Sequence, residues 1–136
     1  MKIILPWPHK HLNPNSRKHW TQKAKATREY RDECYWETIS QVVQPNKFKK
    51  HIIDWEGTIH VIVEFYPPDK RRRDDDNVFA SFKAGRDGIA DALSVNDRRF
   101  RMHPVLSDET VKGGKVIVLI CSDKNFADIT NRTMGV

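Results

Sequence analysis

Apolar and polar residues alternate along residues 58–66, and this period of two predicts a β-strand. One face of the segment carries only apolar side chains, at Ile59, Val61, Val63 and Phe65. Ile62 places an apolar residue on the opposite face too, so we expect the strand to be covered on both sides. The most apolar run, at 115–121, predicts a central strand, and residues 2–5 predict a short first strand that ends at Pro6.

Helical spacing predicts two further elements. Residues 17–43 contain neither Pro nor Gly and predict a long helix. Its buried stripe is predicted at Tyr30, Cys34, Ile39 and Val42. Residues 74–93 predict a second helix. Its apolar stripe is predicted at Val78, Phe79, Phe82, Ile89 and Leu93. Gly85 and Gly88 weaken this second helix, so we expect it to be bent or closely packed there.

The remaining segments have weaker patterns. Residues 100–106 predict a strand at the edge of the sheet, because Pro104 lacks the N–H that a central strand needs. Gly113 and Gly114 predict a hairpin turn. Residues 122–136 have little periodicity and predict a loosely held tail.

These elements follow the order β-α-β-α-β-β, which predicts an α+β (mixed α/β) fold with a small mixed sheet flanked by two helices. The 136 residues suffice for one domain. We expect that domain to span residues 1–121, followed by a C-terminal tail at 122–136.

The net charge of +6 favours an anionic partner, and nucleic acid is the commonest one for basic proteins. The first 28 residues contain seven Lys or Arg and no Asp or Glu, and aromatic rings such as Trp7 and Trp20 lie between them. Rings can stack on unpaired bases while cations neutralise phosphates. A merely solvated cationic surface is the alternative interpretation.

Other functions are disfavoured by missing motifs. Cys34 and Cys121 lie far apart, which predicts reduced thiols in a cytoplasmic protein. No apolar run approaches the length of a membrane span or of a signal peptide, so we expect no membrane partner. The scattered histidines form no zinc motif, and no Ser or Cys lies in a nucleophile motif. The chain also lacks the Gly-rich loop that cradles ATP phosphates, so we expect no nucleotide cofactor.

Residues 67–77 combine four cations with three carboxylates that follow them directly. Adjacent carboxylates repel one another unless a cation shares them, and either an arginine or a divalent metal can supply that charge. Basic residues beside a metal-suited acidic cluster can hold a phosphodiester and hydrolyse it. We expect phosphate contacts from Lys70, Arg71, Arg72, Arg73, Arg17, Lys18, Arg98 and Arg99.

The predicted helix at 74–93 places Asp76 in its first turn, with Lys83 on the same stripe. Asp74 precedes the helix and can turn toward Asp76, and Asp97 follows the helix in a turn. These three carboxylates could hold Mg²⁺ or Mn²⁺, and Lys83 could polarise a phosphate. The alternative is that the aspartates only cap the helix, which accounts for one carboxylate but not three in a row.

Three parts of the sequence together resemble the RusA family of Holliday-junction resolvases, small endodeoxyribonucleases that are common in prophages. The first part is Ile4-Leu5-Pro6-Trp7-Pro8 with the basic residues that follow it. The second is the basic run and acidic signature from Pro68 to Asn77. The third runs from Asp87 through Asn96-Asp97 to the Lys112-Gly113-Gly114 turn.

The resemblance implies a metal-dependent homodimer that binds four-way DNA junctions and cuts two opposed strands symmetrically, in recombination and repair. It implies that Asp74, Asp76 and Asp97 bind the metal. The lysine of the family pattern falls on Ala80 here, and Lys83 is the candidate to replace it. That departure leaves open a protein of the same fold that binds junctions without cutting them, or a nuclease for other branched or single-stranded DNA.

Overall fold

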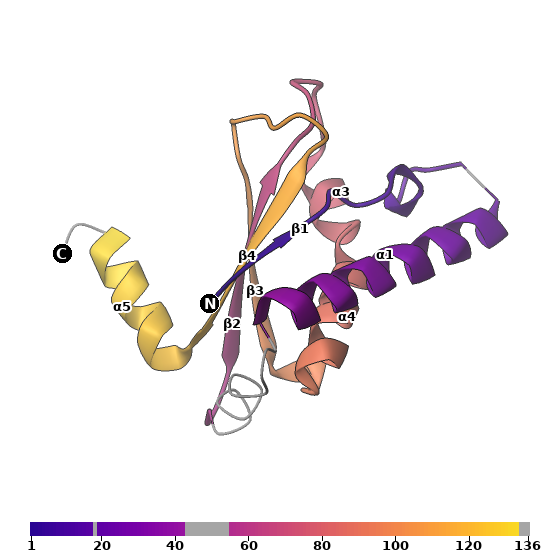
Figure 1. Ribbon diagram of the computed structural model, residues 1–136. Helices are drawn as coiled ribbons and strands as arrows, with labels where there is room; N and C mark the ends of the chain where they lie inside the picture. Colours follow the sequence, from indigo (N-terminus) through magenta and orange to yellow (C-terminus); the bar gives the residue numbers. More distant parts are fainter. Residues whose placement is uncertain (18, 43–54, 134–136) are drawn as a thin grey trace.

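Strands in the order β1-β4-β2-β3 form one mixed sheet in the computed structural model, which describes the chain except for residues 18, 43–54 and 134–136 (Figure 1). Their bounds are Lys2–Leu5 for β1, Ile59–Tyr66 for β2, Phe100–Leu106 for β3 and Lys115–Ser122 for β4. β4 is antiparallel to both β1 and β2, whereas β2 and β3 are parallel. The predicted central strand and the predicted edge strand are confirmed.

The turn at Gly113 and Gly114 forms, but the predicted hairpin is wrong. Both glycines have positive φ angles, 80° and 73°, which suit a residue without a side chain. The strands on either side of the turn are β3 and β4, and β2 lies between them in the sheet. The turn therefore carries the chain past β2 rather than back along β3.

Because β2 and β3 are parallel, the chain between them must cross over the sheet. It does so through α3 (Asp75–Ala80), α4 (Lys83–Leu93) and the 3-10 turn η2 (Asp97–Arg99). The prediction of one continuous helix over 74–93 is wrong, because regular helix stops at Ser81. Its hydroxyl donates to the backbone oxygen of Val78 at 2.6 Å, and Phe82 N–H bonds three residues back to Phe79.

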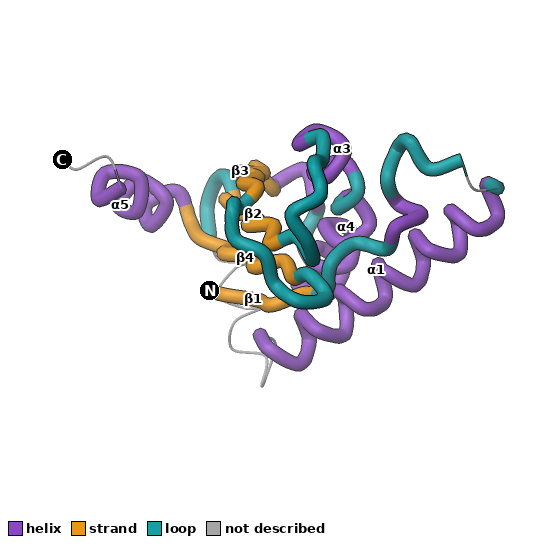
Figure 2. Tube along the Cα trace, turned by 90° about the horizontal axis from the view of Figure 1, so that it is seen from above, coloured by secondary structure: helices purple, strands orange, loops and turns teal. Residues whose placement is uncertain are grey.

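The core lies between one face of the sheet and the pair α1 (Trp20–Val42) and α4 (Figure 2). Tyr30 and Cys34 of α1 are fully buried, as their spacing predicted. Gly88 of α4 faces the backbone of Arg31 so closely that a methyl group has no room. The glycines that weaken this helix therefore permit close packing of α1 against α4.

Residues 122–136 do not begin as a loose tail, because α5 spans Asp123–Thr133 and projects away from the opposite side of the sheet (Figures 1 and 2). Its first turn is fixed by side chains of β2 and β3. His60 Nε2 lies 2.6 Å from Asp123 Oδ1, and His60 Nδ1 lies 2.9 Å from His103 Nε2. Phe126 stacks on both imidazoles, with centroid distances of 4.1 and 4.3 Å.

The chain of hydrogen bonds through this histidine pair has one consistent set of donors when His60 is neutral. Asp123 is an acceptor, so His60 Nε2 donates, and a neutral His60 then accepts at Nδ1 from His103. The bond from His60 lowers the pKa of Asp123 below its ordinary value. Burial, followed by the nearby His60 and Arg101, lowers the pKa of His103.

The rest of this second sheet face is less covered than predicted. Ile4, Ile117, Glu64 and Val105 form one row across β1, β4, β2 and β3. Ile4 and Val105, at the two edges, are 46% and 50% exposed. In β2 itself, Ile62, Glu64 and Tyr66 are partly exposed on this face, so the strand is fully covered on one face only.

Candidate nucleic-acid interface

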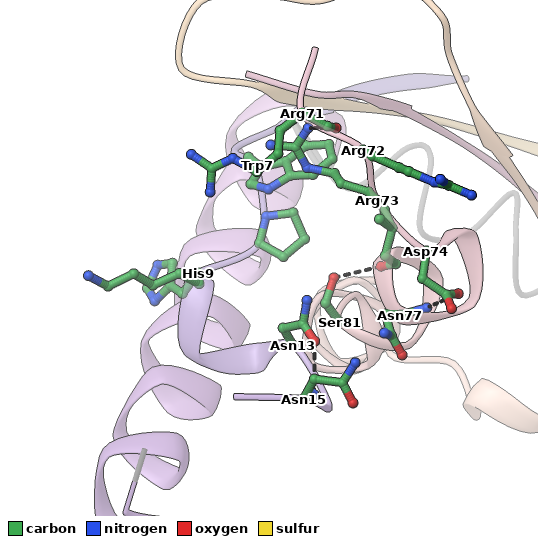
Figure 3. Close-up of a pocket in the computed structure, with 13 residues that line it drawn as sticks. Trp7, His9, Asn13, Asn15, Arg71, Arg72, Arg73, Asp74, Asn77 and Ser81 are labelled. Carbon is green, nitrogen blue, oxygen red and sulfur yellow. Dashed lines mark hydrogen bonds between the residues drawn. The ribbon is translucent and has the colours of Figure 1, made fainter. Parts of the chain in front are cut away.

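A groove of about 420 Å³ lies where the N-terminal segment, the loop before α3 and α3 itself come together (Figure 3). Trp7 and His9 line it from the N-terminal segment, and Arg71 to Asp74 line it from the loop before α3. The side chains of Asn77 and Ser81 line it from α3 and lie near Asn13 and Asn15 in Figure 3. Segments that are some sixty residues apart in the sequence therefore form one cationic, partly aromatic surface.

The N-terminal side of the groove is held by α1. The Tyr30 hydroxyl donates to the backbone oxygen of Pro6 at 2.7 Å, and burial raises the pKa of that hydroxyl well above its ordinary value. His9 Nε2 lies 2.9 Å from a carboxylate oxygen of Glu33. These contacts hold Pro6 and His9 on α1, and Trp7 lies between them in the sequence.

Trp7 contacts segments from three distant parts of the sequence. Its ring packs edge-on against Phe65 of the core, with centroids 6.2 Å apart. A methyl group added to Gly114 would lie 2.8 Å from the Trp7 Cβ and 3.2 Å from Pro68. The Arg73 guanidinium lies over the Trp7 ring at 5.7 Å.

Arg73 differs from the other cations of its run, because its side chain is only 18% exposed. Its guanidinium donates to the backbone oxygens of Asp69 and Arg71, both at 3.0 Å, and pairs with the Asp69 carboxylate at 2.9 Å. The Arg71 N–H and then Arg73 lower the pKa of Asp69. The Arg73 guanidinium is therefore already engaged by contacts inside its own loop, and its predicted phosphate contact stays a prediction.

The acidic run begins α3. Asp74 is the N-cap residue, and its Oδ1 accepts from the N–H groups of Asp76 and Asn77 at 2.9 and 3.4 Å. Asp75 and Asp76 occupy the first turn, and all three aspartates are exposed. The capping interpretation therefore holds for Asp74, whereas it does not account for the side chains of Asp75 and Asp76.

Asp97 and Lys83 lie elsewhere. Asp97 Oδ2 accepts from Arg86 at 3.3 Å, a partner that the sequence pattern did not single out. Lys83 is exposed at the start of α4 and lines a separate cavity of about 280 Å³ with Ala80 and Arg86. Because the helix is interrupted at Ser81, the predicted stripe does not bring Lys83 into the groove that Asp74 lines.

A hard divalent cation would find only part of its predicted donor set here. Among the residues that the structure describes, no three His, Cys, Asp or Glu side chains form a group that could hold a metal ion. The predicted trio of Asp74, Asp76 and Asp97 is thus not assembled. Asp74 and Asp76 remain as exposed carboxylates two residues apart at the start of α3, a donor set that fits Mg²⁺ because this ion takes one or two carboxylates beside water and phosphate.

The other predicted phosphate contacts fall into two groups. Lys70, Arg71, Arg72, Arg17 and Arg98 are exposed. Arg99 is half-buried and donates to the backbone oxygen of Trp55 at 2.6 Å, so it ties η2 to the segment before β2. Lys18 lies outside the described residues.

Alternative chemistry is not supported in the described part of the chain. Cys34 and Cys121 are free and buried, and burial raises the pKa of the Cys34 thiol to about 12, so it stays protonated. No helix among the described residues is long and apolar enough to cross a membrane.

No protein-family model matches this chain. A protein of Xylella fastidiosa strain Temecula1, described as uncharacterized, is 42% identical over 118 residues. The matched region covers 87% of this chain and 74% of that protein. The chain therefore belongs to the same family as the Xylella protein.

Proposed function

We propose that this protein is an endodeoxyribonuclease that resolves four-way DNA junctions by paired, symmetric strand cleavage in recombination and repair. The observation that carries the proposal is the groove, where exposed arginines border the Asp74 carboxylate at the start of a helix, with Asp76 two residues further on. The resemblance to the RusA family supplies the substrate class. A cytoplasmic location, with access to the DNA, is part of the same proposal.

The cationic side of the groove would bind the DNA backbone. Arg71 and Arg72 line the groove and are exposed, so both can reach phosphates. Asn13 and Asn15 line it as well and offer amide donors. Such contacts position the backbone, while the shape of the junction determines which DNA fits.

Mg²⁺ or Mn²⁺ would be held by Asp74 and Asp76, whose carboxylates supply hard oxygen ligands. When bound, such an ion lowers the pKa of water and neutralises charge on a leaving oxygen. One oxygen of Asp74 is occupied by the cap, which leaves its second oxygen available. Lys83 and Asp97 belong to the proposal only if DNA binding brings them toward this groove.

A protein that binds junctions without cutting them is the second candidate. It is favoured by the ion pair of Asp97 with Arg86, which engages the third predicted ligand. It is also favoured by the position of Lys83 in a different cavity. The two candidates share the binding surface and differ only in hydrolysis.

The proposal includes a homodimer, because a junction has two equivalent scissile strands and a two-fold dimer presents two equivalent sites. The partly uncovered sheet face, with Ile4 and Val105 exposed, is where we would first look for the interface. Val105→Lys should then convert a dimer to a monomer in sedimentation velocity. An unchanged dimer would place the interface elsewhere.

The function is tested with end-labelled substrates: a four-way junction, a matched linear duplex and a splayed fork. Each is incubated with Mg²⁺, Mn²⁺ or a chelator. We expect paired nicks only in the junction and only with metal. Asp76→Asn should abolish them, whereas the matched control Asp75→Asn removes the same charge one residue away and should cut. Tight junction binding with no cut in either metal would establish the second candidate, and failure to bind any of the three DNAs would refute both.

A further inference from the structure

We propose that Arg73 is a positioning residue, which with Asp69 and Trp7 holds the loop of residues 69–73 in the shape that presents Arg71 and Arg72 to phosphates. This inference rests on the proposed binding of DNA in the groove. It separates the four cations of the run into one that shapes the loop and three that face outward.

The first support is the set of partners that Arg73 already has. Its guanidinium bonds two backbone oxygens and one carboxylate of its own loop, at 2.9 to 3.0 Å. Asp69 completes the loop by accepting the N–H of Arg71 at 2.9 Å. A planar guanidinium can serve several acceptors in fixed directions, which an ammonium on a flexible stem cannot do.

The second support is the fixed position of the Trp7 ring, over which the Arg73 guanidinium lies. Trp7 is fixed by Phe65 on the core side and by the turn at Gly114, where no side chain fits. That turn is itself joined to the end of β2, since the Val111 N–H donates to the Pro67 oxygen at 2.9 Å. The loop that Arg73 closes is therefore joined to the end of β2 where it begins, and it rests on the Trp7 ring where it ends.

Direct binding of a phosphate by Arg73 is the competing hypothesis, and lysine separates the two. If Arg73 contacts phosphate, Arg73→Lys keeps the charge and should keep most of the affinity for a junction. If Arg73 positions the loop, we expect Lys to weaken binding about as much as Ala does, by roughly tenfold. Arg71→Lys is the matched control and should stay close to the unchanged protein.

For Asp69→Ala, the two hypotheses predict changes in DNA affinity of opposite sign. Removing a carboxylate near phosphate should tighten binding if charge alone matters, as we expect for the control Asp75→Ala. Loss of loop shape should weaken binding instead, because the Arg71 N–H and the Arg73 guanidinium both lose an acceptor. Weakening by Asp69→Ala beside tightening by Asp75→Ala supports positioning; tightening by both overturns it.

A perturbation without any charge change comes from the turn. Gly114→Ala pushes against Trp7, whereas Gly113→Ala at a similar φ meets nothing within 4 Å. The two variants thus share backbone strain and differ in the contact with Trp7. We expect only Gly114→Ala to reproduce the binding loss of Arg73→Lys.

Hydrogen exchange tests the positioning without DNA, so that it stands or falls independently of the proposed function. In Arg73→Lys and Asp69→Ala, the amides of residues 69–73 should exchange faster, with those of β4 unchanged as the measure of global stability. Unchanged exchange in the loop, or an Arg73→Lys protein that binds junctions like the original, would overturn the proposal. If the original protein does not bind junctions, but the loop amides still exchange faster in both variants, the proposed function is refuted and the positioning role of Arg73 stands.

Discussion

Asp74 has two roles that substitution can separate, because its carboxylate caps α3 and is also a proposed metal ligand. Asn caps a helix about as well as Asp, whereas Ala does not. Asp74→Asn should therefore keep the two hydrogen bonds to the N–H groups of Asp76 and Asn77. It also removes one of three adjacent negative charges, so we expect it to be at least as stable as the original protein.

Asp74→Ala loses both cap bonds and should cost about 1 kcal/mol of unfolding free energy. For a chain of 136 residues, an unfolding entropy of roughly 2.1 cal/mol/K per residue converts this loss to a fall in Tm of about 3–4 °C. Both variants should lose cleavage under the proposed function. Urea and thermal unfolding, followed by circular dichroism, measure the difference between them.

The comparison between the Asn and Ala variants is decisive for the cap. Equal destabilisation by both would show that charge, not the hydrogen bonds, stabilises the start of α3. A stable Asp74→Asn variant that still cuts junctions would remove Asp74 from the proposed metal ligands while leaving the cap in place.

Three further predictions concern the surface and the histidine pair. Arg72→Ala should weaken junction binding and reduce the slope of log K against log salt by about 0.9, and an unchanged slope would remove Arg72 from the interface. If DNA binding brings Lys83 to the groove, Lys83→Ala should slow cleavage more than it weakens binding, because a lysine that polarises the reacting phosphate acts mainly in the transition state; normal rates would exclude this role. Stability should fall as pH drops from about 7 toward 5, since the lowered pKa of His103 means that the unfolded chain takes up the proton first. His103→Phe should flatten that part of the stability profile, and an unchanged profile would point to another group.

The regular elements could be predicted where the hydrophobic period was long. Strands β2 and β4 were found within a residue of their ends, because short alternating or continuous apolar runs bounded by turn residues are typical of strands. The interruption of the helix at Ser81 could not be predicted from the sequence, because serine also occurs inside continuous helices. Only the folded structure shows that its hydroxyl bonds to the Val78 oxygen. The helix α5 was missed because its docking depends on His60 and His103, which come from distant strands.

The candidate site was predictable where its residues adjoin in sequence. Asp74 and Asp76 lie together because they are two residues apart at one helix start. The pairing of Asp97 with Arg86 could not be inferred, because it depends on how η2 follows α4. Arg73 looked like its three neighbours in a run of cations, and only the positions of Asp69 and Trp7 show that it faces inward.

The resulting distribution of charge links DNA binding to the proposed metal. Arg73 is paired with Asp69, which leaves Arg71 and Arg72 as the exposed arginines at the groove. Exposed carboxylates follow them directly at the start of α3. A phosphate drawn in by the cations must approach those carboxylates, and like charges repel. A divalent cation between them would convert that repulsion into attraction. In a chelator, Asp76→Asn should therefore bind a junction more tightly than the original protein, and the advantage should shrink when Mg²⁺ is added. Equal affinities in the chelator would mean that DNA does not approach this part of α3.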